Sequence, residues 1–267
     1  MSLPTLSKAD LIALSETDVT KPIPRESIFA ALATPPFLYI PGTFNTRDLG
    51  LLSLSSSSNG NKIRPGLIYR SGGFFPNGGF DDAAKTQLST QLGIKKIFDI
   101  RSVREHTHAP DPEINGVENV WVGSAEKEAT VDLKDFLEGK GEGGRGRGAG
   151  SAAVPLHGWT RQNGVVAGLL LSLAGVSEED VEMDWMLSRI GTEMAREQLL
   201  GFAMKGAGCK SVEEPGFANL VSLRRECWGA FVEEVKRVYG GWRGYVRGTL
   251  GLTEEEVERV GRVLRGE

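Results

Sequence analysis

Residues 81–102 read DDAAKTQLSTQLGIKKIFDIRS, and this stretch decides the fold class. Two aspartates open a segment whose apolar residues have helical spacing, and Gly93 ends it. Residues 94–102 then predict a buried strand, IKKIFDI, that ends in polar residues. A helix, a glycine stop and an apolar strand form the repeating unit of α/β folds. The sequence therefore predicts an α/β domain.

The neighbouring sequence continues this pattern. Residues 67–70 (LIYR) and 116–123 (GVENVWVG) are predicted strands, and residues 37–40 are a third, shorter one. Residues 165–174 predict a helix buried on every side, and SEED at 177–180 is a capping box that opens a helix to Ser188. The C-terminal third is expected to be helical, over residues 217–239, 242–250 and 253–264. We expect a central, mostly parallel sheet flanked by helices.

Composition excludes several classes of protein. The 267 residues include 31 Lys and Arg against 35 Asp and Glu, whereas nucleic-acid binders usually carry a basic excess. Two cysteines are too few for a disulfide framework and indicate a reducing, cytoplasmic location, and the N-terminus has no secretory signal pattern. The longest apolar run, residues 165–176, is shorter than the roughly 17 residues of a membrane span. We therefore expect no nucleic-acid partner and no stable membrane insertion.

Domain organisation follows from the glycine content. Residues 138–153 read EGKGEGGRGRGAGSAA, a composition that cannot bury enough apolar surface to become ordered. The sequence predicts an N-terminal extension over 1–35 and a single domain over 36–267, interrupted by a low-complexity disordered insert at about 138–154. The insert is either a flexible linker or an Arg-Gly tract. A structureless stretch of this length inside a compact domain also suggests that it is out of place.

Arginines stand at the ends of the predicted strands. Arg70 and Arg101 each follow a strand directly, and Arg47 lies in the turn-rich stretch before them. Ligands of open α/β sheets bind beyond the carboxyl ends of the strands, and a guanidinium fork matches phosphate oxygens. The alternative is local ion pairing, of Arg47 with Asp48 or of Arg101 with Glu105. Together the arginines favour an anionic substrate.

Taken in order, these segments resemble a known family. NTRDLG (45–50), RPGLIYRSG (64–72) and IFDIRSVRE (97–105) are similar to the motifs of the atypical protein-tyrosine phosphatases of fungi and bacteria, which are dual-specificity-like cysteine phosphatases. The resemblance continues through GVVAGLLLSLAGVSEEDVEMDWMLS (164–188) and YGGWRGYVRGTLGLTEEEVERVGRVL (239–264). The order of the motifs makes the resemblance specific.

The resemblance implies a cysteine-phosphatase fold that hydrolyses a phosphate monoester through a phosphocysteine, without a cofactor or metal. The expected partner is a phosphotyrosine protein or another phosphate monoester such as a phosphoinositide. It implies further that Arg47, Arg70 and Arg101 line the phosphate site. Asp99 is a candidate general acid, with capping of its own strand end as the alternative role.

The family's phosphate loop, H-C-x-x-G-x-D-R-T-G, is absent from the chain as written. Counted back from Gly164, Leu156 stands in the position of the nucleophilic cysteine and Gln162 in that of the phosphate-clamping arginine. Neither Cys209 nor Cys227 begins a C-x5-R sequence. Since leucine cannot attack phosphorus, we expect this polypeptide to be inactive. The alternative function is a pseudophosphatase, which binds a phosphorylated partner without turning it over.

The genetic code offers an explanation for the missing loop. Residues 154–163 can be encoded as GTT CCA CTG CAC GGC TGG ACA AGA CAG AAC. Read one base later and completed by the first base of the Gly164 codon, the same string gives F-H-C-T-A-G-Q-D-R-T, which is the complete loop at the correct distance from the following helix. The single codon of Trp159 forces the central glycine. We therefore expect that this stretch was translated one base out of frame.

One further pattern is weaker. His106 and His108 form an H-x-H pair, which can bind a metal in some hydrolases. No carboxylate at a fixed spacing accompanies them, and we expect them to be exposed loop residues.

Overall fold

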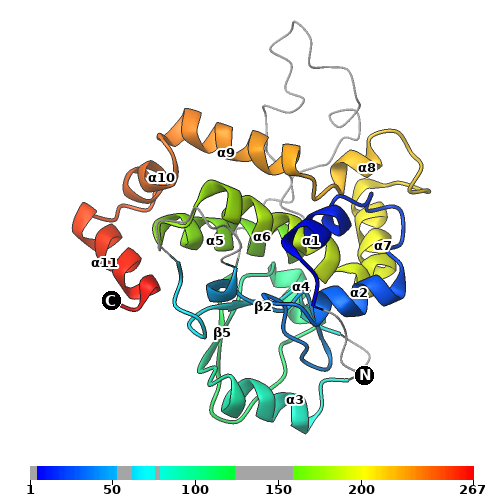
Figure 1. Cartoon of the computed structure of the whole chain (residues 1–267), viewed down its shortest axis with the longest axis horizontal. Coiled ribbons are helices and arrows are strands. Elements are labelled where there is room, and N and C mark those ends of the chain that lie inside the picture. Colours follow the sequence, from blue (N-terminus) through cyan, green and yellow to red (C-terminus); the bar gives the residue numbers. More distant parts are fainter. Residues whose placement is uncertain (1–4, 53–61, 76–78, 124–158) are drawn as a thin grey trace, which may run out of the picture.

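The computed structural model describes residues 5–52, 62–75, 79–123 and 159–267 (Figure 1). Its helices are α1 (Lys8–Ser15), α2 (Arg25–Leu32), α3 (Asp82–Thr86), α4 (Val103–His108), α5 (Trp159–Leu173), α6 (Glu178–Gly191), α7 (Arg196–Ala207), α8 (Phe217–Leu220), α9 (Arg225–Tyr239), α10 (Trp242–Gly248) and α11 (Glu254–Arg265). Its strands are β1 (Thr43–Phe44), β2 (Arg47–Asp48), β3 (Tyr69–Arg70), β4 (Gly73–Phe74), β5 (Lys96–Asp99) and β6 (Glu118–Trp121). The predicted insert at 138–154 lies outside the described residues.

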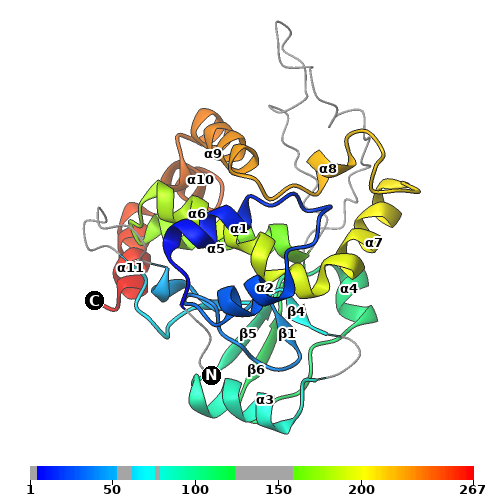
Figure 2. The ribbon, with the colours of Figure 1, turned by 45° about the vertical axis from the view of Figure 1, so that its right-hand side comes forward.

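Helix α6 is the centre of the helical part. It contacts α1, α2, α5 and α9, and most of its side chains are buried. Ser177 caps it by accepting a hydrogen bond from the Asp180 backbone, as the capping pattern predicts. Figures 1 and 2 show α9 on one side of the α5–α6 pair and the strands with α3 on the other. Because α6 lies in the interior, side chains that extend from the strands can contact it.

Helix α5 confirms the helix predicted over 165–174 but corrects its burial. Leu171 and Ala174 are fully buried, whereas Val166 is 43% exposed. The helix packs on α6, α10 and α11, and this leaves part of its surface open in the described structure. The apolar residues over 165–174 therefore predicted the helix correctly, but they did not predict how much of its surface other helices cover.

The strands form pairs, and in the described residues no wide central sheet joins them. Strand β1 pairs with β4 and β2 with β3, both antiparallel, while β5 pairs with β6 in parallel. The prediction of α/β structure is confirmed. The central, mostly parallel sheet is not found among the described residues, where β5–β6 is the one parallel pair beside two antiparallel ones. Of the strand predicted over 37–40, only a single bridge from Phe37 to Arg47 forms.

Strand β5 is less buried than its sequence predicts. Asp99 is buried, whereas Phe98, on the other face, is 61% exposed. Lys96 and Glu118, which share that face with Phe98 by strand alternation, form a surface ion pair of 2.8 Å. The β5–β6 pair therefore has one face toward the protein and one toward solvent.

Both ends of the chain join the main core. Leu11 in α1 and Ile28 in α2 belong to the same buried cluster as Trp185 and Leu264. The division into an extension over 1–35 and a domain over 36–267 stays a prediction. Within the described ranges, no helix combines the length and the apolar character that a bilayer span requires.

The predicted helix over 217–239 is interrupted. Helix α8 ends at Leu220 and α9 begins at Arg225. The Ser222 hydroxyl accepts a hydrogen bond from the Arg224 backbone N–H and offers the chain an alternative to the helix.

Candidate functional site

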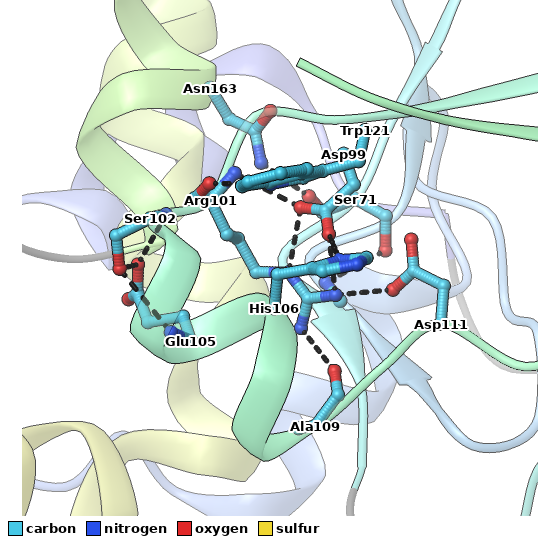
Figure 3. A network of polar contacts seen from close by, with 11 residues as sticks. Ser71, Asp99, Arg101, Ser102, Glu105, His106, Ala109, Asp111, Trp121 and Asn163 are labelled. Atoms are coloured by element: carbon cyan, nitrogen blue, oxygen red, sulfur yellow. Dashed lines mark hydrogen bonds and ion pairs between the residues drawn. The ribbon is translucent and has the colours of Figure 1, made fainter. Parts of the chain in front are cut away.

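The IFDIRSVRE motif forms a compact ionic turn at the end of β5 (Figure 3). Asp99 is the last residue of the strand, and Arg101 folds back onto it. Arg101 Nε donates to Asp99 Oδ1 at 2.7 Å and Nη2 donates to Oδ2 at 2.8 Å. Ser102 then caps α4, and Glu105 completes a capping box by bonding back to the Ser102 N–H. The spacing of the motif is therefore explained first by local structure.

His106 joins this turn from the next turn of α4. Its Nδ1 lies 2.7 Å from Asp99 Oδ2. An ionised carboxylate has no proton to give, so His106 donates. The imidazole stacks on the indole of Trp121 at 4.8 Å between ring centroids and 13° between planes. The expectation that His106 is merely an exposed loop residue is wrong, because α4 turns its ring onto the strand end.

Arg101 also binds the loop that follows α4. Its Nη1 donates to the Ala109 carbonyl at 2.9 Å and its Nη2 to Asp111 Oδ1 at 2.7 Å. The guanidinium thus holds two carboxylates and one backbone oxygen. The described contacts of Arg101 therefore hold the end of β5 and the loop after α4 together.

The pKa values of the two carboxylates that bind Arg101 are shifted in opposite directions. Burial alone would raise the pKa of Asp99, but hydrogen bonds from Arg101 and His106 outweigh it and hold that pKa below its ordinary value. Burial raises the pKa of Asp111, and the charge of Asp99 adds to this while Arg101 opposes it. Asp99 is therefore ionised at neutral pH, a state that does not favour its predicted role as general acid.

A second ionic cluster lies on α6. Arg47 and Arg70 face each other across the β2–β3 pair, and both reach Asp184. Arg47 Nε donates to Asp184 Oδ1 at 2.7 Å, and Arg70 Nη1 donates to Oδ2 at 2.5 Å. Arg47 also binds the Asp184 carbonyl at 2.7 Å and Ser188 Oγ at 3.0 Å. Every member of this triad is buried.

Asn45, the first residue of the NTRD motif, has a structural role in this cluster. It has a left-handed backbone with φ of 56°, which asparagine tolerates better than most residues. Its side-chain oxygen binds Arg47 Nη1. Gly191 faces this oxygen, and a Cβ at that position would collide with it.

Burial and the neighbouring charges shift the pKa values of Arg70 and Asp184. Burial and the neighbouring Arg47 lower the pKa of Arg70 to about 10, against the attraction of Asp184. Burial alone would raise the pKa of Asp184, but the two guanidinium groups outweigh it and lower that pKa. Arg70 and Asp184 are therefore both charged at neutral pH.

The beginning of α5 lies against the end of β3. Asn163 Nδ2 donates to the Ser71 carbonyl at 2.9 Å. A Cβ built on Gly164 would lie 2.7 Å from the Trp185 ring and 3.7 Å from Arg70 Nη2. Gln162 lies in α5 and is partly buried, whereas Leu156 is outside the described residues. Arg70 and the start of α5 are therefore neighbours in the structure.

The structure thus brings Arg47 and Arg70 together on Asp184, and Asp99 and Arg101 together at the end of β5. Their role in phosphate binding stays a prediction. Sequence reasoning missed Asp184, although an acidic residue within the apolar stretch MDWML (183–187) was a signal for a buried ion pair. It also missed Trp121. Within the described residues, no three His, Cys, Asp or Glu side chains are placed to hold a metal ion.

Comparison with known proteins extends the sequence resemblance. The model of the tyrosine phosphatase family matches residues 38–147 and 162–265, well over half of the 267-residue chain. The two matched segments are separated by residues 148–161, which include Leu156. No match was found among curated proteins. On the strength of both matched segments, the chain belongs to the tyrosine phosphatase family.

Proposed function

We propose that this fold serves the hydrolysis of phosphate monoesters, phosphotyrosine first among them, and that the polypeptide as written does not turn them over. The observation that carries the proposal is the family match on both sides of residues 148–161, combined with the absence of any C-x5-R sequence. Because two cysteines are too few for a disulfide framework, we place the protein in a reducing compartment, the cytoplasm.

The reaction proposed for the restored loop is a double displacement. A cysteine thiolate attacks phosphorus, the bond from phosphorus to the ester oxygen breaks, and a general acid protonates the leaving oxygen. Water then attacks the phosphocysteine and gives a proton to the general acid's conjugate base, the P–S bond breaks, and phosphate and thiolate result with the acid restored. The thiolate is favoured by its place at the start of a helix, where backbone N–H groups also bind phosphate oxygens.

We assign the described arginines different parts in this site. Arg70 lies beside Gly164 at the start of α5, so it is the candidate for contact with phosphate. Arg47 is 0% exposed and supports Arg70 through their shared partner Asp184. Arg101 and Asp99 hold the end of β5, and Asp99 remains a candidate acid only if ligand binding displaces its present partners.

The messenger tests the first half of this proposal. Sequencing the cDNA should reveal codons over residues 154–163 that spell H-C-x5-R one base out of register. A full-length chain carrying FHCTAGQDRT in place of VPLHGWTRQN should hydrolyse an aryl phosphate. Changing the cysteine of that loop to serine should abolish the hydrolysis without unfolding the protein. Codons that cannot spell the motif in any frame would remove the repair hypothesis.

The second candidate is a pseudophosphatase, favoured by Leu156 and Gln162 at the two essential positions. Calorimetric titration of the chain as written with phenyl phosphate should then give saturable binding without release of inorganic phosphate. Absence of binding would exclude this alternative.

A further inference from the structure

Trp121 and His106 form a stacked pair of rings at the carboxyl end of the β5–β6 pair (Figure 3). The register places Trp121 opposite Asp99, so both side chains lie on the same face. That end of a parallel strand pair is where α/β folds bind ligands. The pair therefore lies at the expected edge of the site.

Each ring is held by a hydrogen bond at its polar edge. Trp121 Nε1 donates to the Arg101 carbonyl at 3.1 Å, and His106 Nδ1 donates to Asp99 Oδ2 at 2.7 Å. Gly123 lies against the indole, since a Cβ there would be 2.8 Å from Cζ2. The rings are thus fixed in place before any ligand arrives, which reduces the entropy lost on binding.

Both rings are nevertheless accessible. Trp121 is 41% exposed, and the His106 side chain is 34% exposed. A rigid indole with an open surface beside an ionic turn is suited to contact a flat ring, because aromatic rings prefer offset or edge-to-face contacts with each other. No part of the hydrolysis proposed above uses this surface.

We propose that Trp121, backed by His106, contacts the flat aromatic group of a phosphate ester and thereby favours aromatic over alkyl esters. The proposal rests on the proposed function, since it takes the ligand to carry a phosphate. The phenyl ring of an aryl phosphate and the base of a nucleotide share the required chemistry. Trp121 is on this proposal a specificity-determining residue and takes no part in bond breaking.

The experiment is an NMR titration of two 15N-labelled, full-length proteins. One is the chain as written, and the other carries the loop FHSTAGQDRT at residues 154–163, in which serine replaces the nucleophilic cysteine. The probes are phenyl phosphate, glycerol 2-phosphate and adenosine 5′-monophosphate. The five tryptophans give up to five indole N–H signals, and Trp121→Phe identifies the signal of Trp121 by its loss. Phenyl phosphate should shift that signal, and glycerol phosphate at equal occupancy should not.

Variants separate a ring contact from a general effect on the site. Trp121→Leu should reduce the preference for phenyl over glycerol phosphate about 3- to 10-fold, while Trp121→Phe should keep most of it. Phe98→Leu is the matched control, because Phe98 is an exposed aromatic residue on the opposite face of the same strands. Circular dichroism on every variant checks the fold.

The outcomes distinguish the two proposals. Equal affinity for both esters, or a preference that survives Trp121→Leu, overturns this inference and leaves phosphate binding intact. Failure of both forms of the chain to bind any ester overturns the proposed function and this inference with it. Adenosine monophosphate binding tighter than phenyl phosphate, and dependent on Trp121, would support the ring contact with a base as its occupant.

Discussion

Arg47 and Arg70 are cross-strand partners whose guanidinium groups meet on one carboxylate, that of Asp184. Two positive groups share one negative group in a part of the protein closed to water, so each contact matters more than it would at the surface. The strand pair that carries both arginines is only two residues long on each side. Its position is therefore fixed as much by the ion pairs to α6 as by the backbone ladder.

Removing the charge of Asp184 should destabilise the protein strongly. Asp184→Asn leaves two buried guanidinium groups without their counter-charge, and we expect the free energy of unfolding to fall by about 3–5 kcal/mol. Urea unfolding followed by circular dichroism measures this. Glu178→Gln on the same helix is the control, since its ion pair with Lys236 is exposed and should contribute less than about 1 kcal/mol. Equal effects of the two substitutions would show that the buried triad has no special weight.

The start of α5 should tolerate no side chain at Gly164. Gly164→Ala places a Cβ 2.7 Å from the Trp185 ring, and we expect a loss of about 1–3 kcal/mol in the free energy of unfolding. Gly201→Ala in α7 meets no atom within 4 Å and should stabilise the protein by up to about 1 kcal/mol. Thermal unfolding of both variants provides the comparison. If Gly164→Ala were as benign as Gly201→Ala, the close packing of α5 on α6 would be refuted.

Acid should weaken the turn at the end of β5. Because the folded pKa of Asp99 is lowered, its contribution is complete above the unfolded pKa of about 3.9 and is lost as pH falls through the folded value. Below about pH 4, the free energy of unfolding of Asp99→Asn should therefore fall less steeply with decreasing pH than that of the parent protein. Urea unfolding measured at a series of pH values checks this.

Asp111 supplies a control of opposite sign. Its folded pKa is raised, so its contribution falls as pH rises from the unfolded value of about 3.9 through the folded one. Asp111→Asn should remove that decline. The same sign of change in Asp99→Asn and Asp111→Asn would contradict the arrangement of charges around Arg101.

The chain as written should release no phosphate from an aryl phosphate above a vector control. Cys209 and Cys227 are each partly buried, and each lacks the arginine that a phosphate loop requires. The Cys209→Ser/Cys227→Ser double variant should therefore match the parent in a phosphate-release assay. Turnover that persists in the double variant would require another nucleophile or a metal and would end the phosphocysteine proposal for this chain.

The local elements of the fold could be predicted because their signals are local. Three elements follow from caps, glycine stops and apolar spacing: the helix over 82–86, the strand at 96–99 and the capped helix beginning at Glu178. Burial was harder to predict, because it depends on what packs against an element. Residues 165–174 are more apolar than α6, yet α6 is the helix surrounded on most sides.

The site was predictable in its parts but not in its pairings. Arg47, Arg70, Asp99 and Arg101 were identified by chain position, whereas the partner of the first two lies more than a hundred residues away. No local pattern could assign Asp184 to them. His106 was identified, but its surroundings were predicted wrongly, since a short helix after Ser102 turns its ring back onto Asp99.

The triad also has a consequence for the time at which the protein can fold. Asp184 is separated from Arg47 by 137 positions, and the Arg64 backbone N–H bonds the Leu264 carbonyl near the other end of the chain. Contacts of such long range form late, because the intervening chain must first be brought together. A ribosome that has released only the strands leaves both arginines in water, where they remain until α6 emerges. Closure of the triad therefore waits for the synthesis of α6, and a nascent chain halted before α6 has no counter-charge for the arginines of its β2–β3 pair.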